Sequence, residues 1–319
     1  MFEKLLRIIR KNRLLRGITV KILLLIRPQI EKGLNVMYRM QEVCSMNFTH
    51  YLPNTEERID RLRRIINKRP VAIILPGFSV TELEKRITEL KNYDICYACP
   101  NTFKVFEEHI LQKINRKISL FMCSAPPGLY TQIGNHNIID FLERQEDNIF
   151  ISDIVSFHER KMPEGFNLDT FIKKYDKKLL FFTATAGWLY GQVPNIQYPL
   201  NFPKQNSLSI LLSFAVIGGA SEIILFGADG GRINKSPELY FRESNLEYTQ
   251  GSKSQEPIEK TLMLEAEVFN VMMPLVLEKT YRTYNLEAID IFNCSEQSHY
   301  TTFTKLSYDD TFALLKHSS

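Results

Sequence analysis

Asp229 is the residue of this chain that is best placed for chemistry. It follows an apolar run, Glu222 to Phe226, that is typical of a buried strand, and it lies in the glycine-rich turn Gly227 to Gly231. In open α/β sheets, ligands bind outside the carboxyl ends of the strands, where this carboxylate is expected. Because Asp-Gly is also a common turn pair, a simple turn-capping role is the alternative.

A second polar turn, Pro76 to Ser79, follows the strand-like run Val71 to Leu75. Ser79 and Glu82 have the spacing of a capping box, so a helix is expected to begin at Ser79. The free backbone N–H groups at such a helix start suit a phosphate or a ribose. The signal is weak, because a single glycine matches neither the GxGxxG pattern nor a P-loop.

The segment directly before the Asp229 strand reads as a helix. Asn206 and Ser207 are small polar residues, Leu208 to Ile217 is an apolar run, and Gly218 and Gly219 end it. One α/β unit is therefore formed by this helix, the glycine turn, the strand and the turn that carries Asp229, and the chain is organised around it.

The same alternation of strand and helix patterns runs along most of the chain. It predicts an α/β fold, a Rossmann-like, doubly wound, mostly parallel sheet. Further strands are expected at 94–98, 118–123, 148–152, 179–183 and 288–292, and further helices at 103–111, 168–175, 259–281 and 307–316. The polar stretch 230–256 is expected to be a lid or substrate loop, with plain disorder as the alternative.

Composition places the chain among ordinary globular proteins. Its 319 residues carry a net charge of +4, which is weak evidence for a polyanionic partner, and no nucleic acid is expected. Five scattered cysteines favour a reducing, cytoplasmic setting. Cys96 and Cys99 form a CxxC, but on a strand they point to opposite faces, which favours structural cysteines over a redox or zinc pair.

The amino-terminal part differs from the rest, so residues 1–52 are expected to be a basic amphipathic helical extension and residues 53–319 the main domain. The unbroken apolar run 22–26 is far shorter than the roughly 20 residues that span a bilayer. A signal peptide is not expected, because basic residues continue and no small-residue cleavage site follows. Residues 1–27 either lie on an anionic membrane, at its inner face, or pack on the protein or a second subunit. A homo-oligomer is therefore left open.

Three motifs together resemble one superfamily: Leu75 to Ser79, Ala98 to Asn101, and Ser207 to Asp229. A fourth phrase, Leu277 to Tyr281, is also similar. The superfamily contains the MptE-like proteins (6-hydroxymethylpterin pyrophosphokinase-like) and the motility accessory factor glycosyltransferases. Bacterial lipooligosaccharide sialyltransferases are more distantly similar. The resemblance spans residues 70–310 in short motifs.

The resemblance implies a Rossmann-like sheet that binds a nucleotide, which in the sialyltransferases is CMP linked to a nonulosonic, sialic-type sugar. It implies a glycosyltransferase that joins a nucleotide-sugar donor to a glycan or glycoprotein acceptor. It places Asp229 at the core of the site. Tyr240 and Tyr248, in the loop that follows, are candidates for steadying the leaving phosphate, and the alternative is that they are ordinary loop tyrosines. The implied nucleotide-binding residues are Gly77, Ser79, Asn101, Ser124, Asn206 and Ser207.

The chain also departs from the sialyltransferase pattern. Pro76 stands in place of an Asn, and Leu208 in place of a Gly. Those enzymes use a His in the loop after Gly-Ile-Asp as general base, whereas residues 230–280 contain no His here. The sequence leaves the base open among Asp229, Glu243, Glu247 and His158.

Two other functions stay open at this point. The first is ATP-dependent diphosphate transfer to a pterin, with magnesium held by Asp153 and Asp229. The second is a non-catalytic nucleotide-binding protein. For the glycosyltransferase no metal cofactor is expected, because the sequence has no DxD-like pair.

Overall fold

The computed structural model describes residues 55–100, 103–123, 138–153, 167–185, 200–203, 206–233, 240–241 and 256–318. The amino-terminal extension lies outside these residues, as do the predicted site residues Asn101, Ser124 and Tyr248.

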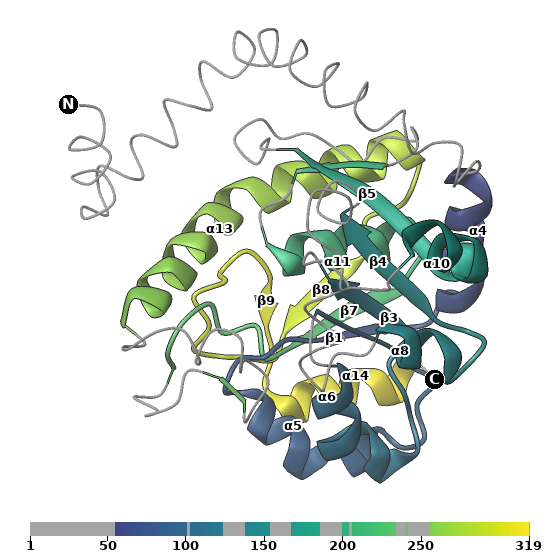
Figure 1. Ribbon diagram of the computed structural model, residues 1–319. Helices are drawn as coiled ribbons and strands as arrows, with labels where there is room; N and C mark the ends of the chain where they lie inside the picture. Colours follow the sequence, from purple (N-terminus) through teal and green to yellow (C-terminus); the bar gives the residue numbers. More distant parts are fainter. Residues whose placement is uncertain are drawn as a thin grey trace, which may run out of the picture.

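One nine-stranded sheet forms the centre of this part of the chain, and every strand pair in it is parallel (Figure 1). From edge to edge the order is β6-β5-β4-β3-β2-β1-β7-β8-β9. The strands are β1 Val71–Ile74, β2 Cys96–Pro100, β3 Leu120–Cys123, β4 Ile149–Asp153, β5 Leu179–Thr185, β6 Leu200–Pro203, β7 Glu222–Phe226, β8 Asp290–Asn293 and β9 Thr304–Lys305.

Helices cover both faces of the sheet. One face is covered by α5 Val80–Arg86, α6 Phe103–His109, α8 Ile138–Glu143, α10 Leu168–Tyr175 and α14 Tyr308–Ser318. The other is covered by α4 Thr55–Ile66, α11 Ser207–Ile217 and α13 Glu256–Tyr284. Short 3-10 turns lie at Ile87–Leu90, Leu111–Ile114 and Asp176–Lys178. Figure 1 shows α11 and α13 on one side and α5, α6 and α14 on the other.

Burial on both faces explains the strand sequences. β1 (VAII) and β7 (EIILF) are buried along their whole length, so they are continuous apolar runs rather than alternating ones. The predicted α/β doubly wound, parallel fold is therefore confirmed. β6 and β9 were not predicted; both are short edge strands, and Pro203 is tolerated in β6 because an edge strand has one unpaired side.

The two cysteines of the CxxC lie on opposite faces of β2, as predicted. Cys96 packs in the core under α4 and α11, whereas Cys99 packs in the core under α5 and α6. Both thiols are fully buried, and burial raises the pKa of Cys96 to about 11. They are therefore structural cysteines, since a reactive cysteine needs an exposed, low-pKa thiolate.

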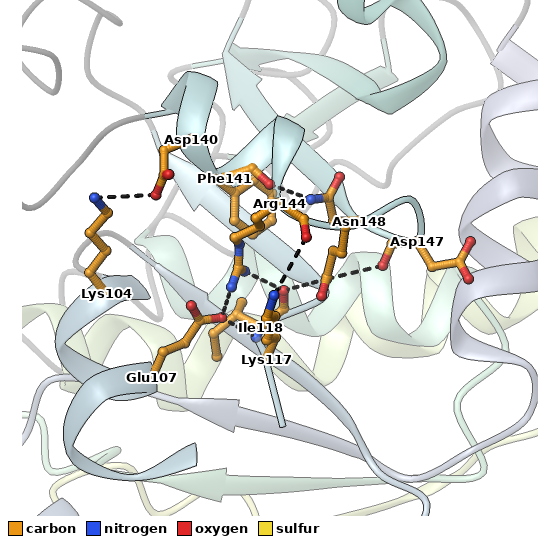
Figure 2. Close-up of polar contacts among 10 residues, drawn as sticks. Lys104, Glu107, Lys117, Ile118, Asp140, Phe141, Arg144, Asp147 and Asn148 are labelled. Carbon is orange, nitrogen blue, oxygen red and sulfur yellow. Dashed lines mark hydrogen bonds and ion pairs between the residues drawn. The ribbon is translucent and has the colours of Figure 1, made fainter. Parts of the chain in front are cut away.

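A partly buried ion pair lies at the amino edge of the sheet, where β3 begins (Figure 2). The guanidinium of Arg144 binds the carboxylate of Glu107 and donates to the carbonyl of Ile118 at 2.7 Å. Glu107 also accepts from the N–H of Ile118 at 2.6 Å. The guanidinium lies over the rings of Phe103 and Phe141, 4.9 and 4.7 Å from their centroids. This cluster joins α6 and α8 to β3, at the edge opposite to the one that bears Asp229.

Candidate functional site

The order of the strands creates a switch point between β1 and β7. The chain leaves β1 towards β2 and builds the sheet outward to β6, then returns through α11 to β7 on the other side of β1. In doubly wound proteins, ligands bind at the carboxyl edge of the sheet beside such a switch point. Gly77 and Asp229 follow these two strands.

Asp229 joins the two strand exits. Its Oδ2 accepts from the backbone N–H of Ser79 at 3.0 Å, and its Oδ1 accepts from the Ser79 hydroxyl at 2.5 Å. The side chain is only 2% exposed. Burial raises the pKa of this carboxyl above its usual value, whereas the hydrogen bonds from Ser79 and the electrostatic effect of the nearby His299 lower it. Both carboxylate oxygens thus have a partner inside the protein.

The expected capping box at Ser79 is wrong. Ser79 is the N-cap of α5, but its hydroxyl donates to Asp229 and makes no capping bond. The amides of the first turn have partners as well: Val80 donates to Gly77, Thr81 to Phe78 and Glu82 to Ser79. The start of α5 therefore offers a phosphate none of the amides of residues 79–82.

Gly77 allows the two strand exits to approach each other. Its N–H donates to the carbonyl of Gly227 at 3.1 Å. A β-carbon at Gly77 would lie 2.6 Å from Cγ of Asp229 and still closer to the Gly227 oxygen. The chain also returns across this turn, because Gly77 forms an antiparallel bridge with Tyr240. The structure thus brings Gly77, Ser79, Asp229 and Tyr240 together.

The loop 294–303, between β8 and β9, packs against the exit of β7. The Ser298 hydroxyl binds the carbonyl of Ala228, and the His299 N–H donates to the carbonyl of Asp229 at 2.8 Å. From the other side, Asn270 of α13 donates to the carbonyl of His299 at 2.8 Å and accepts from the Thr301 N–H at 2.8 Å. These bonds hold the loop between β7 and α13.

Tyr300 in this loop links the turn after β7, which carries Asp229, to the start of α11. Its hydroxyl accepts from Nδ2 of Asn206 at 3.2 Å, and it is 7% exposed. Burial raises the pKa of Tyr300, and the nearby charges of Glu265 and Asp229 raise it further. The phenol is therefore neutral near pH 7 and retains a proton to donate.

The start of α11 is a second feature of the carboxyl edge. Asn206 caps the helix in a capping box with Ser209, whose N–H donates to Oδ1 of Asn206 at 2.9 Å. This cap leaves the amides of Ser207 and Leu208 without intrahelical partners, as at any helix start. Free amides and the helix dipole make this end suitable for an anion.

Four residues of the candidate site were not predicted from the sequence: Glu265, Ser295, His299 and Tyr300. His299 was missed because a histidine base was sought in residues 230–280, with His158 as a spare candidate, and not in the loop after β8. Ser295 is 2% exposed and lowers the pKa of Asp229, yet its Oγ has no hydrogen bond of normal geometry within the described part of the chain. Its place three residues after the predicted strand 288–292 was the one available signal.

The magnesium pair considered for diphosphate transfer is not formed. Asp153 ends β4, and β4 lies four strand positions from β7. Four strand spacings separate the ends of these strands by roughly 19 Å, too far for one ion to bind both carboxylates. Among the described residues, no group of three or more acidic, His or Cys side chains could hold a metal ion.

No protein-family model matches this chain, and no curated protein sequence matches it.

Proposed function

We propose that this protein is a transferase that binds a nucleotide-activated sugar at the carboxyl edge of the sheet, between β1 and β7. The observation that carries the proposal is the 3.2 Å hydrogen bond between Asn206 and Tyr300. This bond connects the start of α11, which suits an anion, to the loop that packs against the turn carrying Asp229. A helix start that suits an anion and a set of buried polar groups thus lie next to each other near the switch point, which supports a ligand site there.

The parts of this edge match the needs of glycosyl transfer. The amides of Ser207 and Leu208 would hold the donor phosphate. The Tyr300 oxygen accepts a hydrogen bond from Asn206, so the phenol proton is left to donate to the departing phosphate oxygen. Tyr300 would thus have the role first considered for Tyr240 and Tyr248. Asp229 would position the turn after β1 through Ser79.

The motif resemblance supplies the donor class in this proposal, a CMP-linked nonulosonic acid, and the acceptor class, a surface glycan or glycoprotein. Diphosphate transfer to a pterin is less well supported, because its expected magnesium ligands lie on distant strands. A non-catalytic nucleotide-binding protein would bind the nucleotide as well, but it would show no turnover with CMP-N-acetylneuraminic acid as donor.

The proposed location is the cytoplasm, with peripheral attachment to the inner face of the membrane through residues 1–27. These residues lie outside the described part of the structure. Among the residues that the structure does describe, no helix has the length and apolar character needed to cross a bilayer.

A thermal-shift panel tests the proposal directly. The full-length protein is heated with CMP, CDP, UDP, GDP, ATP or a pterin, each with and without magnesium. A ligand at ~100 times its Kd that binds only the folded state adds about 2.7 kcal/mol to stability. We expect a clear rise of Tm with CMP and no dependence on magnesium. A rise confined to ATP with magnesium would refute the CMP assignment.

Two substitutions at Ser207 locate the phosphate. No acidic residue occupies the first turn of α11, so Ser207→Asp should stabilise the free protein by about 0.3–1 kcal/mol through the helix dipole. The same charge repels a phosphate, so the CMP-induced rise of Tm should disappear. Ser207→Ala is the matched control and should retain most of the rise. An undiminished CMP response in Ser207→Asp would place the phosphate elsewhere.

A further inference from the structure

Glycosyl transfer needs a base on the acceptor hydroxyl, and the described geometry argues against Asp229. Both of its oxygens accept bonds from Ser79, and the side chain is 2% exposed. We propose that Glu265 of α13 is the general base that removes this proton. The inference rests on the proposed function.

The first half of α13 lies against the exit of β7. A β-carbon on Gly230 would lie 2.9 Å from Cβ of Ala266, and one on Gly231 would lie 3.0 Å from Cγ of Met263. Nearer the start of the helix, Glu259 pairs with Arg232 at 3.5 Å. The stretch 259–266 therefore covers the turn that carries Asp229.

Glu265 differs from the other carboxylates at this edge. It is half-buried and makes no hydrogen bond or ion pair with any residue that the structure describes, whereas Glu259 has Arg232 and Asp229 has Ser79. Its neighbour Ala266 and the ring of Tyr300 both lie beside Gly230, where an added β-carbon would be 2.9 Å from Ala266 and 3.1 Å from Tyr300. In keeping with this placement, the charge of Glu265 raises the pKa of the Tyr300 phenol, which Asn206 contacts. Within the described part of the chain, neither carboxylate oxygen of Glu265 is held by a partner, so both can accept from a ligand.

The surroundings of Glu265 suit a base. Burial raises the pKa of its carboxyl above the usual value, which makes the carboxylate a stronger proton acceptor. The other titratable groups near this place are Tyr300 and His299 of the loop 294–303, Asp229 after β7, and Tyr240 at the β1 turn. His299 is the rival base, since its imidazole lies beside Gly231.

The proposed step balances without a further reactant. The acceptor O–H gives its proton to Glu265 while the acceptor oxygen forms a bond to the anomeric carbon of the donor. The bond from that carbon to the phosphate oxygen breaks, and the electron pair leaves with the nucleotide. Glu265 then releases the proton to solvent.

The first experiment needs no substrate. Unfolding by urea is measured from pH 4 to 8 for the wild type, Glu265→Gln and Glu267→Gln. Glu267 is the matched control, because it lies on the same helix but roughly 200° around it. A raised folded pKa means that the folded wild type binds more protons than the unfolded chain, so its stability falls as pH rises above about 4.5. Glu265→Gln should escape this loss and become more stable than the wild type at neutral pH.

The second experiment measures turnover with CMP-N-acetylneuraminic acid as donor and water as acceptor. We expect Glu265→Gln to lower kcat by ~100-fold or more, to keep the CMP-induced rise of Tm, and to lose the acidic limb of the pH profile. Glu267→Gln should behave as the wild type.

Three results would overturn the inference. They are wild-type turnover in Glu265→Gln, equal destabilisation of that variant at every pH, and loss of the acidic limb in His299→Gln instead. If the wild type neither binds CMP nor hydrolyses the donor, the proposed function itself falls, and this inference with it.

Discussion

Replacing Gly77 with alanine tests whether the close approach of the two strand exits is what requires a glycine. The φ angle of Gly77 is not in the left-handed region, so its backbone accepts any residue. The obstacle is steric: the new β-carbon would lie 2.6 Å from Cγ of Asp229 and closer still to the carbonyl oxygen of Gly227. Main-chain atoms of β7 would have to move away from β1.

The expected loss follows from the contacts that must give way. Overpacking of this kind costs about 1–3 kcal/mol. The bond from the Gly77 N–H to the Gly227 carbonyl contributes about 1 kcal/mol, and the charged bonds between Ser79 and Asp229 contribute about 1.5–3 kcal/mol each. With these bonds weakened rather than lost, Gly77→Ala should lower the free energy of unfolding by roughly 4 kcal/mol.

Gly219→Ala is the matched control. Gly219 has φ +77°, but its β-carbon would meet nothing within 4 Å. The substitution should therefore cost only about 1–2 kcal/mol, from backbone strain alone. Urea unfolding of both variants and the wild type, followed by circular dichroism, gives the two losses. If Gly77→Ala lost no more stability than Gly219→Ala, the steric account of the β1–β7 exit would be refuted.

Three further predictions concern charge. Asp229→Ala should lower the free energy of unfolding by about 3 kcal/mol or more, because it leaves the two Ser79 donors unpaired. Asp229→Asn should stay within about 1 kcal/mol of the wild type, and its stability relative to the wild type should increase as pH rises above 3.8, because burial raises the folded pKa of Asp229. Urea titrations across pH measure both effects. Arg144→Met should cost about 3 kcal/mol by leaving the partly buried Glu107 without its partner. Adding Glu107→Leu should recover only part of this loss, because it also removes the acceptor of the Ile118 N–H, as a double-mutant cycle will show. Deleting residues 1–27 should lower co-sedimentation with anionic liposomes, and equal pelleting of the truncated protein would contradict the proposed attachment.

Much of the fold could be predicted because the signals are local. The apolar run of β7 and the helix pattern of α10 are observed with the predicted bounds. β2 begins at Cys96 rather than at Asp94, whose carboxylate pairs with Arg69 at 2.8 Å in front of the strand. The short edge strands β6 and β9 gave no pattern long enough to be read.

The site was predicted in part. Asp229, Ser79 and Asn206 were identified because they follow strand patterns or begin a helix. Glu265 and Tyr300 were not, because nothing in a local pattern marks a half-buried carboxylate on a long helix or a phenol in a loop.

The sequence by itself determined which segments become buried strands and helices, because burial on both faces of the sheet demands continuous apolar runs. Only the tertiary structure decided that β7 lies beside β1, which joins Ser79 to Asp229 across 150 residues of chain. Strand order depends on non-local pairing, which no short stretch encodes. The same pairing turned the Ser79 hydroxyl from its expected cap towards Asp229 and brought Tyr300 to Asn206.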